Sequence, residues 1–546
     1  MSETDPFHVP PRPPGGPKST APKPIRLIAG FFTVGFWTMA SRILGFVRDI
    51  LIAAFLGSGP VAQAFLVAFS LPNMFRRFFA EGAFNTAFVP LFSKKVEGGD
   101  DAQGFAQDAF SGLASILILL TVVAMVAMPA LVLAMASGFV GDARFTLAVD
   151  FGRIAFVYIV FISLAALFSG MLNAIGRFAA AAAAPILLNI ILVGVMLAVY
   201  WTAPDGKMTN ITDPAEAYGR ALSWGVPIAG VAQMALVWFA VTRAGYKIRP
   251  RLPRLTPDMR KLAVIALPAM LAGGVVQVNL LVGRQVASFF DGAIAWLSFA
   301  DRLYQLPLGV VGIAIGIVLL PDLSRRLRAG DTEGGRHALS RAGELAMALT
   351  IPAAVALMVI PVPLISVLFQ RGEFTADDTA ATALALTVYA MGLPAFVLQK
   401  VLQPVYFARE DTRSPFRFAL VAMVVNAVVA IGLASAIGFL GAAIGTTVAA
   451  WIMVGLLSRG RAGLGDVAQF DDRFRARIWR ICAAAIAMGI VLVGAELLIG
   501  PFLGEPGLRY LALALLVALG IVSYFGFARL FGAFSLSELR GTMRGR

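Results

Sequence analysis

The chain has 546 residues, of which 59% are hydrophobic and only 14% are charged, and its formal net charge is +14. A soluble domain carries about 25% charged residues, so this composition excludes an ordinary soluble enzyme and predicts a polytopic membrane protein. The single cysteine rules out a disulfide bond within the chain, and the two histidines have no cysteine or histidine neighbours, so we expect no metal site and no cofactor.

Residues 1–24 contain eight prolines and no apolar run. This composition predicts a disordered tail. The apolar segment that begins near Ile25 is too long for the hydrophobic part of a signal peptide, so we expect it to remain as a membrane helix.

Fourteen apolar segments follow one another along the chain, and each can supply the about 20 residues that a membrane-spanning helix needs. We therefore predict an all-α polytopic membrane protein with about 14 transmembrane helices. The longest segments should be tilted or bent helices. The segments cover residues 26–57, 61–93, 104–137, 143–172, 178–202, 214–243, 257–290, 292–324, 338–370, 378–409, 413–437, 440–460, 474–500 and 506–532.

The basic residues between these segments alternate from loop to loop. The loops on the amino-terminal side, together with both tails, hold 32 of the 45 lysine and arginine residues, and the opposite loops hold five. Cytoplasmic loops are enriched in basic residues, so this pattern predicts that both termini are cytoplasmic and supports the count of fourteen spans. The net charge is then a signal of topology and of attraction to anionic lipid, and we expect no nucleic-acid partner.

The second half of the chain repeats features of the first half. Leu71-Pro72 aligns with Leu306-Pro307 at an offset of 235 residues. Pro90-Leu91-Phe92-Ser93 resembles Pro321-Asp322-Leu323-Ser324 at an offset of 231. The repeat predicts two lobes of six helices around a central cavity, as in transporters, and chance similarity between apolar segments is the alternative. The predicted parts are a tail at 1–24, an N-lobe at 25–245, a C-lobe at 246–465, and two extra helices with a C-terminal tail at 466–546.

Charged side chains stand inside the predicted membrane segments. Each arginine costs about 2.5–3.5 kcal/mol at a helix centre unless it faces water, a partner or an anion. The surplus is positive, so we predict an anion-binding cavity, although a structural ion pair is the alternative for any single arginine. Arginine suits phosphate because its planar fork binds two oxygens at once. Arg153 is left out of the candidate site because it can snorkel or support packing. The basic residues are Arg42, Arg48, Arg76, Arg77, Arg153, Arg284, Arg302 and Lys400, and the acidic ones are Asp49, Glu81, Asp150 and Asp301.

Two kinds of pairing are expected among these charges. Arg77 and Glu81 are four residues apart, so they should pair along one face of a helix. The charges in Arg48-Asp49 and in Asp301-Arg302 are adjacent in sequence. Adjacent residues on a helix do not face one another, so we expect these charges to find partners on other helices.

Several motifs resemble the MurJ (MviN) family of bacterial lipid II flippases, which belongs to the MOP superfamily. They are SRILGFVRD at 41–49, LPNMFRRFFAEGAFNTAFVPLFS at 71–93, ADRLYQLPLGVVGIAIGIVLLPDLS at 300–324 and FAREDTRSP at 407–415. The resemblance extends over all fourteen segments. It implies two six-helix lobes, two extra C-terminal helices that form a groove for a polyprenyl tail, and lipid II, an undecaprenyl-diphosphate-linked disaccharide-pentapeptide, as the substrate.

The resemblance also implies roles for the charged residues. Four arginines would line the cavity and contact the diphosphate, and other charges would support them. Arg284 is included among the supporting charges only because it lies in an apolar segment, and not because of the resemblance. The family often has an acidic residue where this chain has Gln63, which weakens any role for a carboxylate there. The expected diphosphate ligands are Arg42, Arg48, Arg76 and Arg302, and the supporting cavity charges are Asp49, Arg77, Glu81, Asp301 and Arg284.

We therefore predict a flippase, not an enzyme, that moves lipid II from the cytoplasmic to the outer leaflet of the bacterial cytoplasmic (inner) membrane by alternating access. Such transport serves peptidoglycan synthesis, cell-wall biogenesis and cell shape. The membrane potential and a monovalent cation are the two hypotheses for the energy source. The expected partners are lipid II and the membrane, and proteins of cell-wall synthesis or division are further candidates.

Three alternatives remain open at this point. A MATE-like cation-coupled exporter would have twelve spans and an acid-lined cavity. A membrane enzyme acting on polyprenyl phosphates would need paired carboxylates, a metal or a base at the membrane face. A flippase for another polyprenyl-linked glycan would use the same arginines, because arginine recognises the diphosphate and not the sugar.

Overall fold

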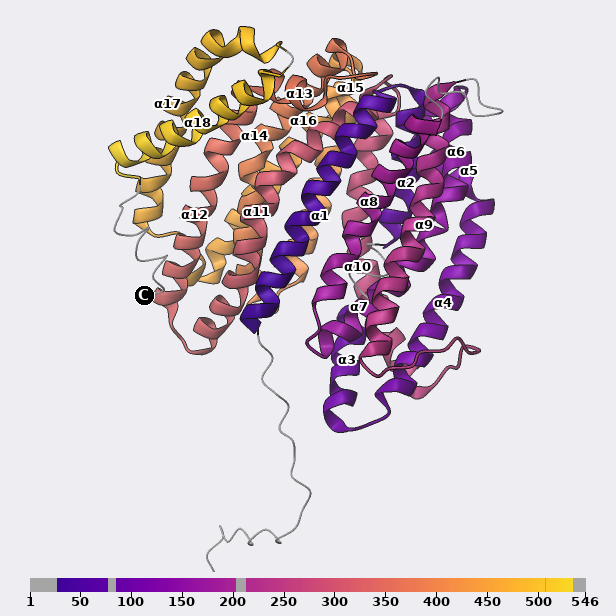
Figure 1. The fold of residues 1–546 in the computed structure, drawn as a ribbon. Helices are drawn as coiled ribbons and strands as arrows, with labels where there is room; N and C mark the ends of the chain where they lie inside the picture. The colour runs from indigo at the N-terminus through magenta and orange to yellow at the C-terminus, as the bar shows by residue number, and fades with distance from the viewer. Residues whose placement is uncertain (1–26, 77–84, 203–212, 506, 534–546) are drawn as a thin grey trace, which may run out of the picture.

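The computed structural model describes residues 27–76, 85–202, 213–505 and 507–533, which form eighteen α-helices and three short 3-10 helices (Figure 1). Most of the α-helices run side by side along the long axis of the molecule. The described residues contain no β-strand, so the predicted all-α fold is confirmed.

Nine α-helices precede residue 245 and occupy the six segments predicted for the N-lobe. Residues 77–84, between α2 and α3, lie outside the described residues. The helices are α1 (Leu27–Leu56), α2 (Pro60–Arg76), α3 (Asn85–Gly98), α4 (Ala102–Val126), α5 (Met128–Met135), α6 (Ala143–Phe156), α7 (Tyr158–Ala174), α8 (Ala179–Thr202) and α9 (Pro214–Arg243), with the 3-10 helix η2 at Ser137–Phe139.

The other nine α-helices occupy the segments predicted for the C-lobe and for the two extra helices. They are α10 (Pro257–Ala287), α11 (Ala293–Arg328), α12 (Thr332–Val359), α13 (Pro361–Phe369), α14 (Ala376–Phe407), α15 (Arg413–Ile437), α16 (Leu440–Gly460), α17 (Asp472–Leu503) and α18 (Arg509–Leu530), with η3 at Arg461–Leu464 and η4 at Asp466–Ala468.

Four of the predicted segments each contain two helices. In the segment 61–93, the residues between α2 and α3 lie outside the described residues, and the other three segments have breaks that the structure describes. Proline accounts for two of the breaks, because Pro129 and Pro361 stand in the first turns of α5 and α13, where a missing N–H does no harm. The break at Val157, between α6 and α7, has no such residue. Ten helical segments among the described residues are long and apolar enough to cross a membrane. The count of fourteen spans stays a prediction.

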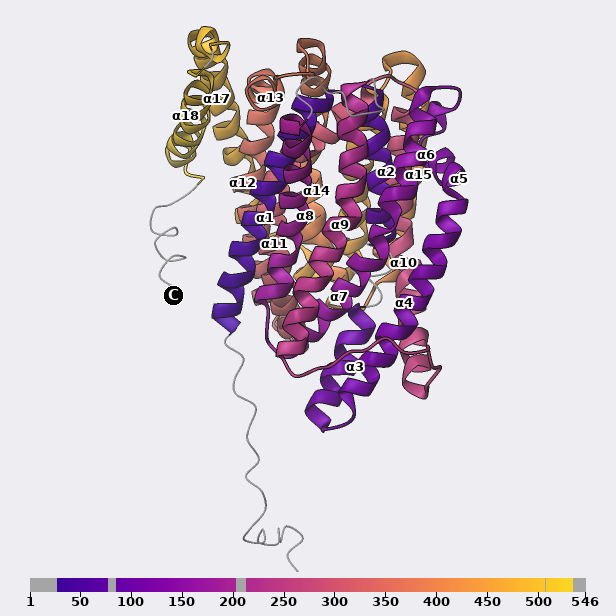
Figure 2. The ribbon, with the colours of Figure 1, turned by 45° about the vertical axis from the view of Figure 1, so that its right-hand side comes forward.

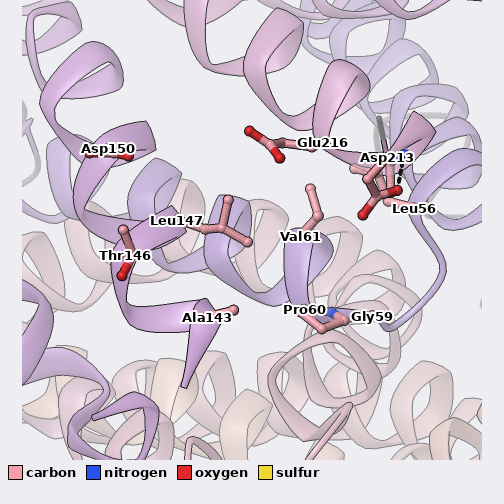
Figure 3. Close-up of a pocket in the computed structure, with 11 residues that line it drawn as sticks. Leu56, Gly59, Pro60, Val61, Ala143, Thr146, Leu147, Asp150, Asp213 and Glu216 are labelled. Carbon is pink, nitrogen blue, oxygen red and sulfur yellow. Dashed lines mark hydrogen bonds between the residues drawn. The ribbon is translucent and has the colours of Figure 1, made fainter. Parts of the chain in front are cut away.

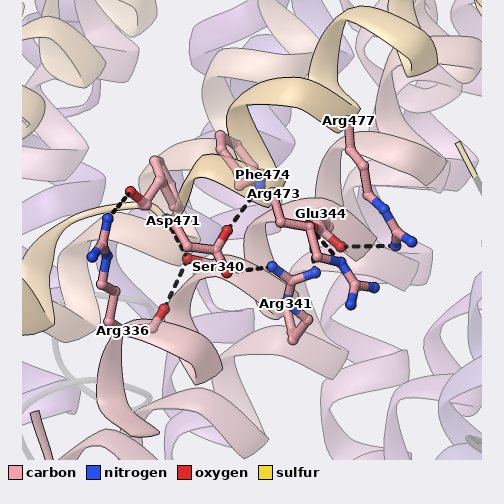
Figure 4. A network of polar contacts seen from close by, with 9 residues as sticks. Arg336, Ser340, Arg341, Glu344, Asp471, Arg473, Phe474 and Arg477 are labelled. Carbon is pink, nitrogen blue, oxygen red and sulfur yellow. Dashed lines mark hydrogen bonds and ion pairs between the residues drawn. The ribbon is translucent and has the colours of Figure 1, made fainter. Parts of the chain in front are cut away.

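The last two helices pack as a pair on the edge of the C-lobe (Figure 2). Their apolar cluster includes Met488 and Leu516 together with Ala348 and Ile360 at the α12 side. A polar network joins the N-terminal end of α17 to α12 (Figure 4). At its centre, Glu344 is 7% exposed and pairs with arginines of both helices.

We call one end of the molecule the outer end, because the loop charges predict that it is extracytoplasmic. It carries the α1–α2, α5–α6, α10–α11 and α13–α14 turns. Between the lobes, α1 lies against α8 on the N-lobe side and beside α11 on the C-lobe side (Figure 1). Side chains of α1 are therefore placed to meet both lobes.

Candidate functional site

The candidate site begins with two adjacent charges on α1, Arg48 and Asp49. Nε and Nη2 of Arg48 donate hydrogen bonds to Oδ1 of Asp49 at 3.0 and 2.7 Å. The expectation that these neighbours would not pair is wrong, because the long arginine side chain folds back along the helix to reach the carboxylate. Nη1 of Arg48 donates to Oδ1 of Asn189 on α8 at 2.9 Å, so every nitrogen of this guanidinium has a partner.

Arg302 on α11 adds the C-lobe to this cluster. Its Nε lies 2.7 Å from Oδ2 of Asp49, so one carboxylate joins arginines from both lobes. The expectation of a partner on another helix is thus confirmed for Asp49. Arg48 and Asp49 are 5% and 6% exposed, whereas the Arg302 side chain is 44% exposed. A ligand would therefore meet the Arg302 guanidinium first.

Helix geometry places these charges at a common depth. Arg48 stands eight residues before the end of α1, and Arg302 stands nine residues after the start of α11. At a rise of 1.5 Å per residue, both lie about 12–14 Å from the outer ends of their helices, near the middle of a hydrocarbon core about 30 Å thick. Arg48 and Arg302 stand there beside Asp49 and Asp301, two charges of each sign. The surplus of positive charge that would favour an anion therefore comes from the neighbouring Arg42.

Arg42 lies further along the same seam between α1 and α11. A Cβ atom on Gly309 would overlap the Arg42 guanidinium, so this group rests against the α11 backbone seven residues beyond Arg302. Glycine is the residue that permits so close an approach to backbone. The structure therefore brings three of the four predicted diphosphate ligands to one seam between the lobes.

The fourth predicted ligand, Arg76, is the last residue of α2 and is half-buried. Arg77 and Glu81, with the pair predicted between them, lie outside the described residues.

Two further predicted charges have their own neighbours. Arg284 on α10 reaches across to the N-lobe, where its Nη1 lies 3.9 Å from Sδ of Met135 on α5. Asp301 accepts a hydrogen bond at Oδ2 from Nε2 of Gln305, one turn further along α11. Asp301 therefore has a partner on its own helix, whereas the sequence predicted a partner on another helix.

Gln63, which stands where the resembled family often has an acid, belongs to a polar cluster at the outer end. It is 2% exposed, and its Oε1 accepts a hydrogen bond from Nη1 of Arg144 at 3.4 Å. Arg144 also pairs with Asp142 at 2.5 Å and with Asp291 of the α10–α11 turn at 2.9 Å. Burial alone would raise the pKa of Asp142, but hydrogen bonds from the Arg144 backbone and guanidinium hold that pKa below its ordinary value.

The α1–α2 turn docks on the α13–α14 turn of the opposite lobe. The backbone N–H of Glu373 donates to the carbonyl oxygen of Ala54 at 2.9 Å. Gly57 and Gly372 have φ angles of 58° and 57°, and a Cβ atom on either would overlap a carbonyl oxygen of the other lobe. Both positions need glycine, because the left-handed backbone and the close contact exclude a side chain.

Asp378 of α14 stabilises the contact between the two turns. Its Oδ1 accepts hydrogen bonds from Oγ of Ser58 at 2.5 Å and from Nε1 of Trp296 at 2.7 Å. Its Oδ2 accepts from the backbone N–H of Thr375 at 2.9 Å, which completes a capping box at the start of α14. One buried carboxylate thus ties the N-lobe turn to two helices of the C-lobe.

A second contact joins the lobes at the same end. The backbone N–H of Ser137 donates to Oε1 of Gln285 at 2.6 Å, and that of Gly138 donates to Oγ of Ser288 at 3.0 Å. Together with Arg144–Asp291, these bonds attach the α5–α6 turn to the α10–α11 turn. The two lobes are therefore joined at the outer end in this structure.

A pocket of about 530 Å³ opens at the outer end of the N-lobe (Figure 3). Its walls come from the ends of α1, α2, α6 and α9. The described residues that line it include the carboxylates of Asp150, Asp213 and Glu216 and no basic residue. Asp213 caps α9, and Glu216 pairs with Arg220 at 2.7 Å. The acidic lining makes this pocket unsuited to a diphosphate.

Sequence reasoning missed several residues of these contacts, and Asn189 and Asp378 are the two with the most partners. Asn189 carries no charge, so a search for intramembrane charges passes over it; its signal is an amide in a helix that is otherwise apolar. Asp378 stands in the first turn of its helix, where an acidic residue ordinarily serves only as a cap, and its contact with Ser58 comes from a turn 320 residues away.

Comparisons with known proteins agree with this architecture. The family model described as lipid II flippase MurJ matches residues 52–504. A curated relative from Rhizobium meliloti (strain 1021), named a probable lipid II flippase MurJ, is 44% identical over 95% of this chain and 96% of its own length.

Solved structures show the same fold. A lipid II flippase MurJ in an inward closed conformation superposes with a TM-score of 0.75 at 24% identity, covering 92% of this chain and 98% of the other. An inward-facing MATE family multidrug resistance transporter of the MOP superfamily gives a TM-score of 0.63 at 12% identity, covering 80% and 98%. The extent of the family match and the identity to the curated relative establish that this chain belongs to the MurJ family of lipid II flippases.

Proposed function

We propose that this protein carries lipid II from the cytoplasmic to the outer leaflet of the cytoplasmic membrane, and that the diphosphate of lipid II binds at the seam between α1 and α11. The observation that carries this proposal is the pairing of Arg302 with Asp49 beside Arg48, because it places cations from both lobes around one carboxylate at mid-membrane depth. Family membership supports lipid II as the substrate.

The arrangement suggests how the headgroup would be captured. Asp49 holds both guanidinium groups in place while the site is empty, which avoids unpaired charge in the membrane. A diphosphate has more negative charge than one carboxylate and can accept two parallel hydrogen bonds from each arginine. It would therefore displace Asp49 as the partner of Arg302, whose side chain is the most accessible of the three.

Arg42 and Arg76 complete the proposed set of ligands. Arg42 lies on the cytoplasmic side of Arg48 along α1, so it would meet a headgroup that approaches from that leaflet. The polyprenyl tail would stay in lipid along α17 and α18, which pack on the edge of the C-lobe.

Transport then requires the outer ends of the lobes to separate. In the present state they are held by the Ser58–Asp378 and Arg144–Asp291 contacts. Neutralisation of the central arginines by the diphosphate would reduce the charge that has to move between the two faces. An elementary charge that crosses 100 mV gains or loses about 2.3 kcal/mol, so an inside-negative potential favours export of an anionic headgroup and return of an empty cationic site.

The test replaces Arg302, and separately Arg48, by alanine in cells that depend on this protein for lipid II export. Arg153→Ala is the matched control, because Arg153 also lies in a membrane helix but is bonded to the carbonyl oxygen of Met125, away from the seam. We expect loss of export for both seam variants at normal protein level, with export retained in the control. Wild-type export from both seam variants would refute the proposed diphosphate site.

A further inference from the structure

The segment that connects the two lobes, residues 244–256, is built in an unusual way. It has no helical structure, and Leu252 and Leu255 within it are 85% and 82% exposed. Its sequence, AGYKIRPRLPRLT, alternates these leucines with exposed arginines and with prolines. Two leucines this exposed stand only three residues apart and are flanked by arginines. Irregular backbone is excluded from the lipid core unless its polar groups are satisfied.

The connecting segment runs along α4 in a fixed register. Nε2 of Gln103 donates to the carbonyl oxygen of Lys247 at 3.5 Å, and Nε2 of Gln107 donates to that of Arg249 at 3.0 Å. The N–H of Arg251 then donates to Oγ of Ser111 at 3.3 Å. Two extended residues advance about 6.6 Å and four helical residues about 6.0 Å, so the segment stays in step with α4 over two turns.

An ion pair stabilises this register between the connecting segment and α4. The Arg251 guanidinium pairs with Asp108 of α4, which is 8% exposed, and donates to the carbonyl oxygen of Gly104 at 3.0 Å. Pro250 and Pro253 have no N–H to satisfy, and the glutamines satisfy two carbonyl groups. Three backbone groups of residues 247–251 are thus bonded to α4. The headgroup layer, unlike the hydrocarbon core, can supply hydrogen-bond partners for the backbone of Leu252 and Leu255.

Two helices independently place the membrane boundary at this level. On α4 the connecting segment covers the helix as far as Ser111, and the next exposed face carries Ile116, Leu119 and Val123. On α10 the exposed residues change within about one turn from Arg260 and Lys261 to apolar ones. The apolar residues there are Val264, Ile265 and Leu267.

We propose that residues 246–256 lie in the headgroup layer of the cytoplasmic leaflet and bind anionic phospholipid. Leu252 and Leu255 insert at the boundary with the acyl chains, and Arg249, Arg254 and Arg260 contact lipid phosphate. Basic residues beside inserted apolar side chains are the pattern of a membrane-surface anchor. The anchor fixes the connection between the lobes at one depth while the lobes move. It depends on the chain spanning a membrane in the predicted orientation, but not on lipid II as the substrate.

The depth of the segment is tested with a single fluorescent reporter. Cys482 is the one cysteine of the chain, so Cys482→Ser provides a background in which Leu252→Cys or Leu255→Cys carries an environment-sensitive label. Val123→Cys serves as the lipid-facing reference and Glu333→Cys, in the exposed first turn of α12, as the aqueous one. The protein is reconstituted without lipid II in vesicles of phosphatidylcholine with or without phosphatidylglycerol.

We expect labels at both leucine positions to be quenched by nitroxides attached near the lipid headgroup and shielded from aqueous iodide. Labels that iodide quenches as strongly as the label at position 333 would overturn the proposal and would favour an aqueous protein partner for this surface.

The charge of the ligand is tested in the same vesicles. Spin-labelled phosphatidylglycerol should quench the reporter more strongly than spin-labelled phosphatidylcholine, and Arg254→Gln should reduce that preference about fivefold, as expected for one arginine near an anionic surface. Arg328→Gln, on the last turn of α11, is the matched control and should leave it unchanged. Equal quenching by the two lipids in the parent protein would refute anionic lipid binding. Loss of the preference on addition of inorganic phosphate at constant ionic strength would refute it as well, because the site would then prefer free phosphate.

Discussion

At the scale of single residues, the contact between Asp49 and Arg302 gives the most direct test of the interlobe seam. Replacing either residue by alanine leaves the other charge without this partner inside the membrane. Because the two side chains touch, their effects on the free energy of unfolding should fall short of additivity by about 0.5–3 kcal/mol. The measurement is a double-mutant cycle of Asp49→Ala and Arg302→Ala, unfolded in detergent.

The control cycle combines Asp49→Ala with Arg153→Ala, which share no contact in the described residues. Their effects should add within about 0.5 kcal/mol. Additivity in the first cycle as well would show that the ion pair contributes nothing in solution.

A second prediction at this scale concerns Asn189, which holds Arg48 from the N-lobe side. Its amide accepts from Arg48 and donates to the carbonyl oxygen of Ser41 at 3.0 Å. Asn189→Leu keeps the volume but removes both bonds, so we expect a loss of about 1–3 kcal/mol in the free energy of unfolding. Asn73→Leu is the control with a smaller expected loss, because Asn73 bonds only to the carbonyl oxygen of Phe69 on its own helix. Equal losses for the two variants would contradict the role assigned to Asn189.

The central charges could be found from the sequence because an arginine inside an apolar segment is costly and therefore conspicuous. The pairing within Arg48-Asp49 could not, because helix spacing describes where Cα–Cβ bonds point and not how far a long side chain folds back. Asn189 was missed because an uncharged amide costs far less than an arginine.

At the scale of elements, the docking of the α1–α2 turn on the α13–α14 turn depends on two glycines. Gly57→Ala or Gly372→Ala introduces a left-handed alanine, which costs about 1 kcal/mol, and also a clash with the opposite lobe. We expect either variant to open the outer junction, seen as faster hydrogen exchange in the α13–α14 turn. Gly99→Ala is the matched control, since Gly99 has φ of 71° with open space around its Cα. Equal exchange in all three variants would show that the junction does not need this close contact.

The attachment of the C-terminal helix pair depends on a second element contact (Figure 4). Glu344 of α12 pairs with Arg341 at 2.5 Å and with Arg477 of α17 at 3.2 Å. Glu344→Gln removes the charge but keeps the shape, so we expect a loss of about 3 kcal/mol and faster hydrogen exchange in α17. Asp472→Asn, whose side chain is 92% exposed, is the control and should change neither quantity. An unchanged exchange rate in the Glu344 variant would mean that apolar packing alone holds the pair.

The positions of the elements followed from apolar length, and each predicted segment contains one helix or two. Two of the internal breaks could have been read from Pro129 and Pro361. The break at Val157 could not, because no local signal marks it and only the packing of α6 and α7 against other helices determines it. The attachment of the connecting segment to α4 also depends on contacts far apart in sequence, about 140 residues for Gln107 and Arg249.

At the scale of the whole molecule, alternating access requires that the lobes separate at the outer end. A disulfide bond between positions 58 and 378 would prevent this, because Oγ of Ser58 and Oδ1 of Asp378 are 2.5 Å apart across the junction. In the Cys482→Ser background, Ser58→Cys with Asp378→Cys should therefore lose lipid II export on oxidation. Mild reduction should restore export, because it breaks the cross-link and leaves the sequence unchanged.

The two variants with a single cysteine, Ser58→Cys and Asp378→Cys, are the controls for this cross-link. Each loses the same native hydrogen bond as the double variant, so any effect of that loss appears in them without dependence on oxidation. A double variant that exports lipid II at the same rate when cross-linked and when reduced would show that substrate crosses the membrane without opening at this junction. The path would then have to run along the lipid-facing side of the lobes, and the interlobe seam at Arg48 and Arg302 would no longer explain translocation.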